Sequence, residues 1–144
     1  AEQDSTSMQR VFEPKAMGAW LLHRRTLDDS DSIQAFIMFS SVAASQGGSG
    51  GQAACAVASA YLDELARLRV ASGLPAVSVQ WPALDLIASS EDSGTDGRAV
   101  HAGTVKQVVK QLVCGIGPLA PVQAVLPSGY LTGVSPPVVA SMLE

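Results

Sequence analysis

The stretch AFIMFSSVAASQGGSGGQAACAVASAYLDELARLRVASGLPAVSVQW, residues 35–81, determines the fold class of this chain. It begins with Ala35–Ser40, a short and nearly unbroken apolar run that is typical of a strand buried on both faces of a parallel sheet. Ala53–Ala71 is rich in Ala and Leu and is predicted to form a helix, which the Gly73–Pro75 turn ends. Ala76–Trp81 alternates and is β-branched, so it is predicted as a second strand. We therefore expect an α/β fold with a right-handed crossover.

The flanking segments carry weaker signals. Residues 8–27 show helical spacing of apolar side chains, with Pro14 inside the pattern. Because proline removes a backbone donor, this segment is either two short helices or one bent helix. Residues 83–102 contain Ser, Asp and Gly clusters and are expected to form a mobile loop. The rest is predicted as a helix at Gly103–Cys114 with Thr104 as its N-cap, a short helix at Pro118–Leu126 and a short strand at Tyr130–Val134.

Two clear strands and one weak strand are too few for a doubly wound sheet, which needs helices on both faces and protected edges. We therefore expect this chain to be the C-terminal half of a larger α/β domain. Its other half would lie on the same parent polypeptide or on another chain. The open sheet edge then predicts association or poor solubility of the chain alone.

The composition argues against several classes of protein. The chain has 144 residues, 47% of them hydrophobic, which is enough for one domain, or part of one, with its own core. A net charge of −4 argues against nucleic acid as a partner, and the apolar stretches are too short for a membrane span. Cys55 and Cys114 form no disulfide framework and, with His23 and His101, lack zinc-ligand spacing, so we expect no metal. This cysteine usage and an N-terminus without signal-peptide character predict a reducing, cytoplasmic compartment.

Three motifs carry a resemblance to a known family. They are VFEPKAMGAWLLH at 11–23, FIMFSSVAASQGGSGGQ at 36–52 and ASAYLDELARLRVASGLPAVSVQW at 58–81. In this order they resemble the ketoreductase domain of a modular polyketide synthase, a relative of the short-chain dehydrogenases/reductases. The match covers about residues 10–82. The resemblance implies a Rossmann-like parallel sheet and makes the whole chain, residues 1–144, the C-terminal part of such a domain.

The resemblance also implies a chemistry and its residues. The family transfers a hydride from NADPH to a β-ketone held as a thioester on acyl carrier protein, using a Tyr, a Lys, a Ser and an Asn. In this chain the Lys is Lys15 and the Ser is Ser41, whereas the Tyr position holds Cys55 and the Asn position holds Ser59. The spacing of four between Cys55 and Ser59 agrees with the family and puts both on one helix face. The segment between Ser41 and Cys55 is one residue longer than in the family.

These departures lead to two hypotheses. The first is a degenerate, structural ketoreductase region, because a thiol at Cys55 cannot reach as far as a phenol and is interpreted as an inert core residue. Tyr61 lies roughly 240° around the helix from Cys55, so we assign it to core packing. The second is an active NADPH-dependent β-ketoacyl reductase with an unusual proton donor, which the retained Lys15 and Ser41 favour. An unrelated small α/β binding module is a third and weaker alternative.

The segment from Gly48 to Ala53 fits the G-x-G-x-x-A dinucleotide motif and lies between a strand and a helix. No acidic residue closes a following strand at the expected distance, so a flexible glycine-rich loop is the preferred interpretation. In the family the NADPH fingerprint lies in the N-terminal half, so we do not expect this chain alone to bind NADPH. The implied partners are that missing half, acyl carrier protein and the neighbouring synthase domains.

Several residues also have a purely structural interpretation. Lys15 could be a solvated helix residue, and Ser41 could cap the turn that follows its strand. The remaining candidates are expected to be structural: His23 and His101 as unpaired histidines, Trp81 as a core residue, and Asp63 with Arg67 as a surface ion pair.

Overall fold

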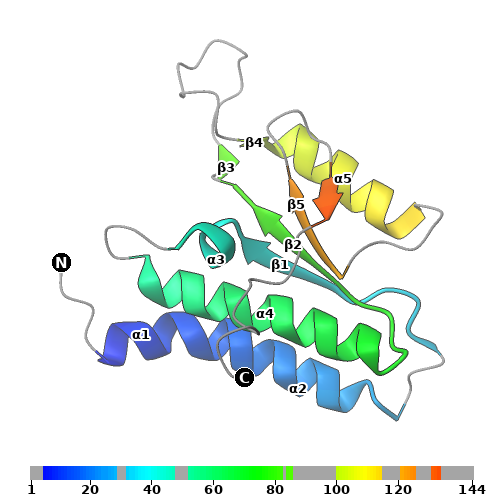
Figure 1. Cartoon of the computed structure of the whole chain (residues 1–144), viewed down its shortest axis with the longest axis horizontal. Coiled ribbons are helices and arrows are strands. Elements are labelled where there is room, and N and C mark those ends of the chain that lie inside the picture. The colour runs from blue at the N-terminus through cyan, green and yellow to red at the C-terminus, as the bar shows by residue number, and fades with distance from the viewer. Residues whose placement is uncertain are drawn as a thin grey trace, which may run out of the picture.

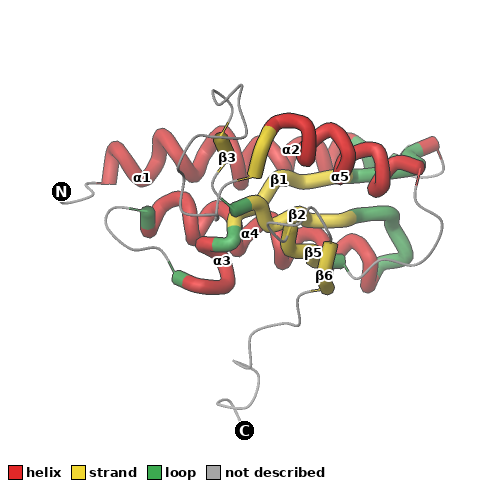
Figure 2. The backbone as a smooth tube through the Cα atoms, turned by 90° about the horizontal axis from the view of Figure 1, so that it is seen from above, coloured by secondary structure: helices red, strands yellow, loops and turns green. Residues whose placement is uncertain are grey.

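The computed structural model describes residues 5–28, 32–47, 52–82, 84–85, 100–114, 121–125 and 131–133. These residues form three layers, in which a central sheet separates two long helices from a third helix (Figures 1 and 2). In chain order the elements are α1 (Ser5–Phe12), the π-helical turn η1 (Glu13–Met17), α2 (Gly18–Arg25), β1 (Ile37–Ser41), α3 (Ala43–Gln46), α4 (Ala53–Ala71), β2 (Val77–Trp81), β3 (Leu84–Asp85), β4 (Val100–His101), α5 (Ala102–Cys114), β5 (Val122–Val125) and β6 (Leu131–Gly133).

The main sheet has the strand order β1-β2-β5-β6. The pairs β1–β2 and β2–β5 are parallel, with Ile37 opposite Val77 and Ser78 opposite Val122, and β6 joins antiparallel to β5. All five residues of β2 are buried, as expected of a central strand that is covered on both faces. The predicted α/β fold with a parallel, Rossmann-like sheet is confirmed.

The N-terminal segment forms one continuous helix with a locally widened turn. The segments α1, η1 and α2 follow one another without a break, and the π-helical turn contains Pro14. The amide of Gly18 donates to the carbonyl of Glu13, five residues earlier, which is the π-helical spacing. The wider turn accommodates a residue that has no amide hydrogen, so the bent-helix alternative is the correct one.

Helix α4 has the predicted bounds, and its C-terminal end is encoded locally. Gly73 adopts φ 75°, and its amide donates to the carbonyl of Val70. The amide of Leu74 donates to the carbonyl of Arg69, which completes a Schellman motif. The helix packs on β1 and β2 and contributes Leu62, Leu65 and Ala66 to a core shared with Met38, whereas α5 packs over Val77, Val79, Trp81 and Val125 on the other face.

Two predictions for the region after β2 are wrong, one of a helix and one of an N-cap residue. Within the predicted helix Pro118–Leu126, residues Val122–Val125 form strand β5, because pairing with β2 buries three of these four side chains. Thr104 is not an N-cap, since α5 already begins at Ala102. In the predicted loop 83–102, the short parallel pair of β3 and β4 and the first residue of α5 are ordered elements, and the rest of that loop lies outside the described residues.

Strand β1 is not buried on both faces as predicted. Met38 and Ser40 are buried toward α4, but Phe39 on the opposite face is 46% exposed. On this face the ring of Phe39 stacks on that of Trp81 with centroids 5.3 Å apart, whereas Ile37 packs against the core that lies under α5. Trp81 itself is buried, as predicted.

The predicted surface ion pair of Asp63 and Arg67 is also wrong. Asp63 is 3% exposed and faces the sheet, and Arg67 instead pairs with Glu64. Helix geometry explains the difference, since the sheet-facing stripe of α4 contains residues 59, 62, 63 and 66. Among the described residues, no helix is long and apolar enough to cross a membrane.

Candidate active site

The structure brings together three of the four residues that the resemblance singled out. Lys15 lies on η1 and donates from Nζ to the Oγ atom of Ser59 on α4, over 2.8 Å. The Sγ atom of Cys55, one helical turn before Ser59, lies 4.0 Å from the same Oγ atom. Cys55, Ser59 and Lys15 therefore form a chain of thiol, hydroxyl and ammonium groups between the two long helices.

Ser59 is the fixed centre of this cluster. Its side chain is fully buried, and its backbone carbonyl accepts a hydrogen bond from the Oγ atom of Ser40, 3.1 Å away on β1. This bond ties the middle of α4 to the sheet, while the bond from Lys15 ties it to η1. Because π-helical turns are frequent at functional sites, the position of Lys15 on such a turn agrees with a site at this point.

Ser41 lies outside this hydrogen-bonded chain. Its Oγ atom accepts the amide of Ala43 at 3.2 Å, so the predicted turn-capping role is confirmed. Side chains alternate along a strand, and it is the neighbouring Ser40 that points toward α4 and reaches Ser59. In the described part of the chain, no hydrogen bond links Ser41 to Lys15, Cys55 or Ser59.

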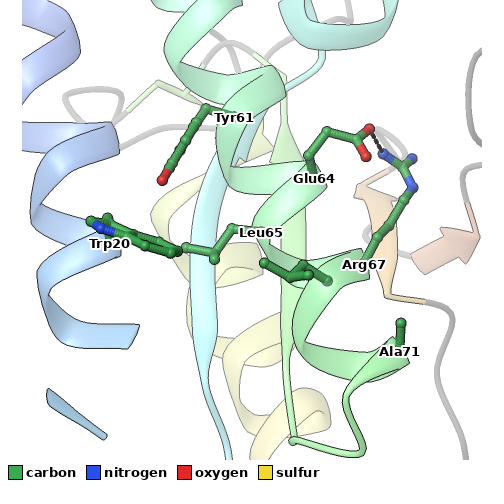
Figure 3. Close-up of a pocket in the computed structure, with 7 residues that line it drawn as sticks. Trp20, Tyr61, Glu64, Leu65, Arg67 and Ala71 are labelled. Carbon is green, nitrogen blue, oxygen red and sulfur yellow. Dashed lines mark hydrogen bonds and ion pairs between the residues drawn. The ribbon is translucent and has the colours of Figure 1, made fainter. Parts of the chain in front are cut away.

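Cys55 is partly exposed, not a buried core residue as predicted. The phenol nearest to it along α4, Tyr61, packs edge-on against Phe12 with ring centroids 6.0 Å apart. Tyr61 also lines an open surface groove of about 570 Å³, together with Trp20, Leu65 and Leu68 (Figure 3). The assignment of Tyr61 to packing is confirmed, and none of the described site residues faces that groove.

A buried carboxylate next to the cluster was missed by the sequence analysis. The two oxygens of Asp63 accept hydrogen bonds from Ser78 Oγ at 2.6 Å and from Gln80 Nε2 at 2.7 Å. Gln80 in turn accepts a hydrogen bond from Ser45 through Oε1, at 3.0 Å. The available signal was spacing, since Asp63 lies four residues after Ser59 and eight after Cys55, on the same helix face. Its partners secure α4 to the central strand.

A second buried polar pair connects α2 and α4 at their C-terminal ends. Arg69 is fully buried, and its Nη1 atom lies 3.0 Å from Nδ1 of His23. The guanidinium also donates to the carbonyl of Pro75 and lies over the ring of Phe36. Burial, with a smaller contribution from the charge of Arg69, lowers the pKa of His23 below its usual value. The prediction that His23 is unpaired is wrong, and the side chain of His101 lies outside the described residues.

The interpretation of the glycine-rich motif as a flexible loop stays a prediction. Residues 48–51 of the glycine-rich motif lie outside the described part of the chain. Gly47 is described, and a Cβ atom added to it would meet nothing within 4 Å. No side chain caps the N-terminus of α4 at Gln52. No group of three or more His, Cys, Asp or Glu side chains among the described residues could hold a metal ion.

The family described as KR domain matches residues 1–85. The chain belongs to the KR domain family. This KR chain is 47% identical over 74 residues to a spectinabilin polyketide synthase system protein of Streptomyces orinoci, an alignment that covers 51% of the chain and 3% of that protein. It therefore spans only a small part of the curated relatives it matches.

Solved structures agree with this assignment. The first ketoreductase of the tylosin polyketide synthase is 34% identical, with a TM-score of 0.64 over 78% of this KR chain and 26% of that chain. The ketoreductase from the first module of phoslactomycin biosynthesis in Streptomyces sp. HK803 is 26% identical, with a TM-score of 0.67 over 86% of this chain and 29% of that one. The predicted relation to polyketide synthase ketoreductases is confirmed.

Proposed function

We propose that this KR chain is the C-terminal part of a ketoreductase domain that has lost reductase activity and serves as a structural region of a polyketide synthase. The observation that best supports the proposal is that Cys55 is the residue beside the Lys15–Ser59 pair. At that point α4 presents the thiol of Cys55, with Sγ 4.0 Å from Ser59 Oγ, where the family has a phenol. A general acid must come within about 3 Å of the atom it protonates, directly or through one water. A thiol ends one bond beyond Cβ, far short of a phenol oxygen.

The hydrogen bonds of the neighbouring residues support the same proposal. Lys15, whose family role is to tune the phenol, donates to Ser59. Tyr61 cannot replace the missing phenol, because its ring packs against Phe12. The carbonyl of Ser59 is occupied by Ser40, so the cluster stabilises the packing of α4 even without turnover. We infer that the cofactor site and the upstream strands of the domain come from outside this chain, and that acyl carrier protein and the neighbouring domains are its partners.

The test is NADPH oxidation with a β-ketoacyl thioester. It is run on this chain alone and on a polypeptide that also carries the upstream half of the ketoreductase domain. We expect no turnover in either, with the longer polypeptide shown to be folded by circular dichroism. Turnover by the longer polypeptide would contradict the proposal.

A second candidate function is an active reductase with an unusual proton donor. It is favoured by Lys15, which is retained and positioned at 2.8 Å from Ser59, and by Ser41, which is retained at the end of β1. If this candidate is correct, the longer polypeptide reduces the ketone, and Lys15→Ala abolishes that activity. A rate that does not change in Lys15→Ala would exclude it.

A further inference from the structure

The side chain of Gln80 connects three elements of the fold. Gln80 lies on β2 and is 2% exposed. Its Nε2 atom donates to Oδ2 of Asp63 on α4 over 2.7 Å, and its Oε1 atom lies 3.0 Å from the donor Oγ of Ser45 on α3. Because an ionised carboxylate only accepts hydrogen bonds, the amide nitrogen of Gln80 faces Asp63 and its oxygen faces Ser45. The side chain therefore ties α3 to the sheet and, through Asp63, to α4.

The single hydroxyl hydrogen of Ser45 has two acceptors within reach. The carbonyl of Val42 lies 3.1 Å away, but it already accepts the backbone amides of Ser45 and Gln46, which use both of its lone pairs. The Oε1 atom of Gln80 has no other hydrogen-bond donor in the part of the chain that the structure describes. We therefore assign the hydroxyl hydrogen of Ser45 to Gln80.

Helix α3 carries this connection to Ser41. The helix has four residues, and a helix this short has little stability of its own, so its position depends on side-chain contacts. The amide of its first residue, Ala43, donates to the Oγ atom of Ser41 over 3.2 Å. A hydroxyl that accepts in this way keeps its own hydrogen, so Ser41 can still donate to another oxygen.

The place of Ser41 in the fold makes that free hydrogen useful. Ser41 is partly exposed and is the last residue of β1. Ligands of open α/β sheets bind at the carboxyl ends of the parallel strands. Among the described residues, the bonds that join Asp63, Gln80, Ser45 and α3 include none from the cluster of Lys15, Ser59 and Cys55. The two networks can therefore be changed independently.

We propose that Gln80 is a positioning residue for the hydroxyl of Ser41, and that it acts through Ser45 and α3. It holds Ser41 as an acceptor for Ala43, which leaves the hydroxyl hydrogen to a carbonyl oxygen of a ligand at the end of β1. That this oxygen belongs to an acyl thioester rests on the proposed function, since a polyketide synthase domain meets acyl chains as thioesters. In this arrangement Ser41 keeps its place even though the Tyr position holds Cys55.

The first test is amide hydrogen exchange in the longer polypeptide, followed at single residues by mass spectrometry. The amide of Ala43 reports its bond to Ser41. Gln80→Met keeps the length of the side chain without its polar ends, and Ser45→Ala removes the donor on α3. We expect each change to speed exchange at Ala43 about fivefold. Ser45→Thr keeps the hydroxyl and should keep the slow exchange, and the double variant should be no faster than Gln80→Met.

Ser78→Ala is the matched control, because it also removes one donor from Asp63 but its hydroxyl bonds no residue of α3 in the described part of the chain. It should leave exchange at Ala43 unchanged, since this amide exchanges through local opening. Equal acceleration by Ser78→Ala and Gln80→Met would overturn the proposal, and so would unchanged exchange in both Gln80→Met and Ser45→Ala. If Gln80→Met does not fold, the exposed Ser45→Ala decides alone.

The second test is binding of the acetoacetyl thioester of N-acetylcysteamine to the longer polypeptide, measured by calorimetry. We expect Ser41→Ala and Gln80→Met each to weaken binding about threefold or more, and Ser78→Ala to leave it unchanged. Absence of binding by the parent polypeptide, or unchanged binding in Ser41→Ala, would overturn the proposal. NADPH oxidation in the same samples tests the proposed function separately, since ketone turnover contradicts that function whatever happens at Ala43.

Discussion

The Nζ atom of Lys15 lies 2.8 Å from the Oγ atom of Ser59, although the two residues are 44 positions apart in the chain. One residue belongs to a π-helical turn and the other to the sheet-facing side of α4. The contact gives the lysine a defined place in this KR chain. We expect this hydrogen bond to stabilise the packing of η1 against α4 whether or not the domain reduces a ketone.

Cys55→Tyr restores the family residue but is not expected to restore reduction. Ser59 would still stand at the Asn position, its carbonyl would still be bonded to Ser40, and its hydroxyl would still accept from Lys15. We expect NADPH oxidation by the longer polypeptide to stay at background in this variant. The measurement is steady-state turnover with a β-ketoacyl thioester, after circular dichroism has shown that the variant is folded. Clear turnover from the single change would show that the loss of activity is due to one residue.

Asp63→Ala should destabilise the domain by about 3 kcal/mol, since it leaves two buried donors, Ser78 Oγ and Gln80 Nε2, without an acceptor. Glu64→Ala is the matched control, because Glu64 is the next residue on α4 and its side chain is 66% exposed. Its loss should change the free energy of unfolding by less than about 1 kcal/mol. Both values are measured by urea unfolding of the ketoreductase domain. Similar effects of the two substitutions would contradict the buried role of Asp63.

His23 should make stability depend on pH in a defined direction. Its pKa is lowered in the folded state by burial and by Arg69, so between the two pKa values the unfolded state binds a proton that the folded state does not. The contribution of neutral His23 to the free energy of unfolding is fully present above the unfolded-state pKa of about 6.5. It is lost as the pH falls from about 6.5 through the lower folded-state pKa.

The change in the free energy of unfolding is at most about 1.4 kcal/mol per pH unit. His23→Asn places an amide oxygen near the Nδ1 position, keeps an acceptor for Arg69 and does not titrate. Urea unfolding of both proteins between about pH 5 and about pH 8 checks this prediction. Parallel pH profiles for the two proteins would show that His23 is not responsible.

Gly73→Ala and Gly18→Ala should have effects of opposite sign. Gly73 has φ 75°, where a Cβ atom is strained, so alanine should cost about 1 kcal/mol. Gly18 has φ −59° within a continuous helical segment, and a Cβ atom there would meet nothing within 4 Å. Alanine at that position should stabilise the domain by about 0.5 to about 1 kcal/mol. Thermal unfolding of the two variants measures both effects, and equal shifts would contradict this assignment of backbone conformations.

The sequence alone determined the elements whose signals are local. Helix α4 begins and ends where its composition and the Gly73–Pro75 turn predict, because a Schellman motif needs only residues that are adjacent in the chain. Strands β1 and β2 were also predicted to within two residues at their ends. Strand β5 was not, since a four-residue segment becomes a strand through its pairing with β2 and carries too little periodicity of its own.

The tertiary structure decided which side chains meet. Asp63 reaches Ser78 and Gln80 across the interface of helix and sheet, and the rotation of α4 on the sheet, not the i,i+4 spacing, selects these partners. The same holds for His23 with Arg69. Local sequence encodes secondary structure through backbone preference and periodicity. The partners of buried polar groups depend on how those elements pack, because rotating α4 about its axis by about 100°, the angle between successive residues, would point other side chains at the sheet.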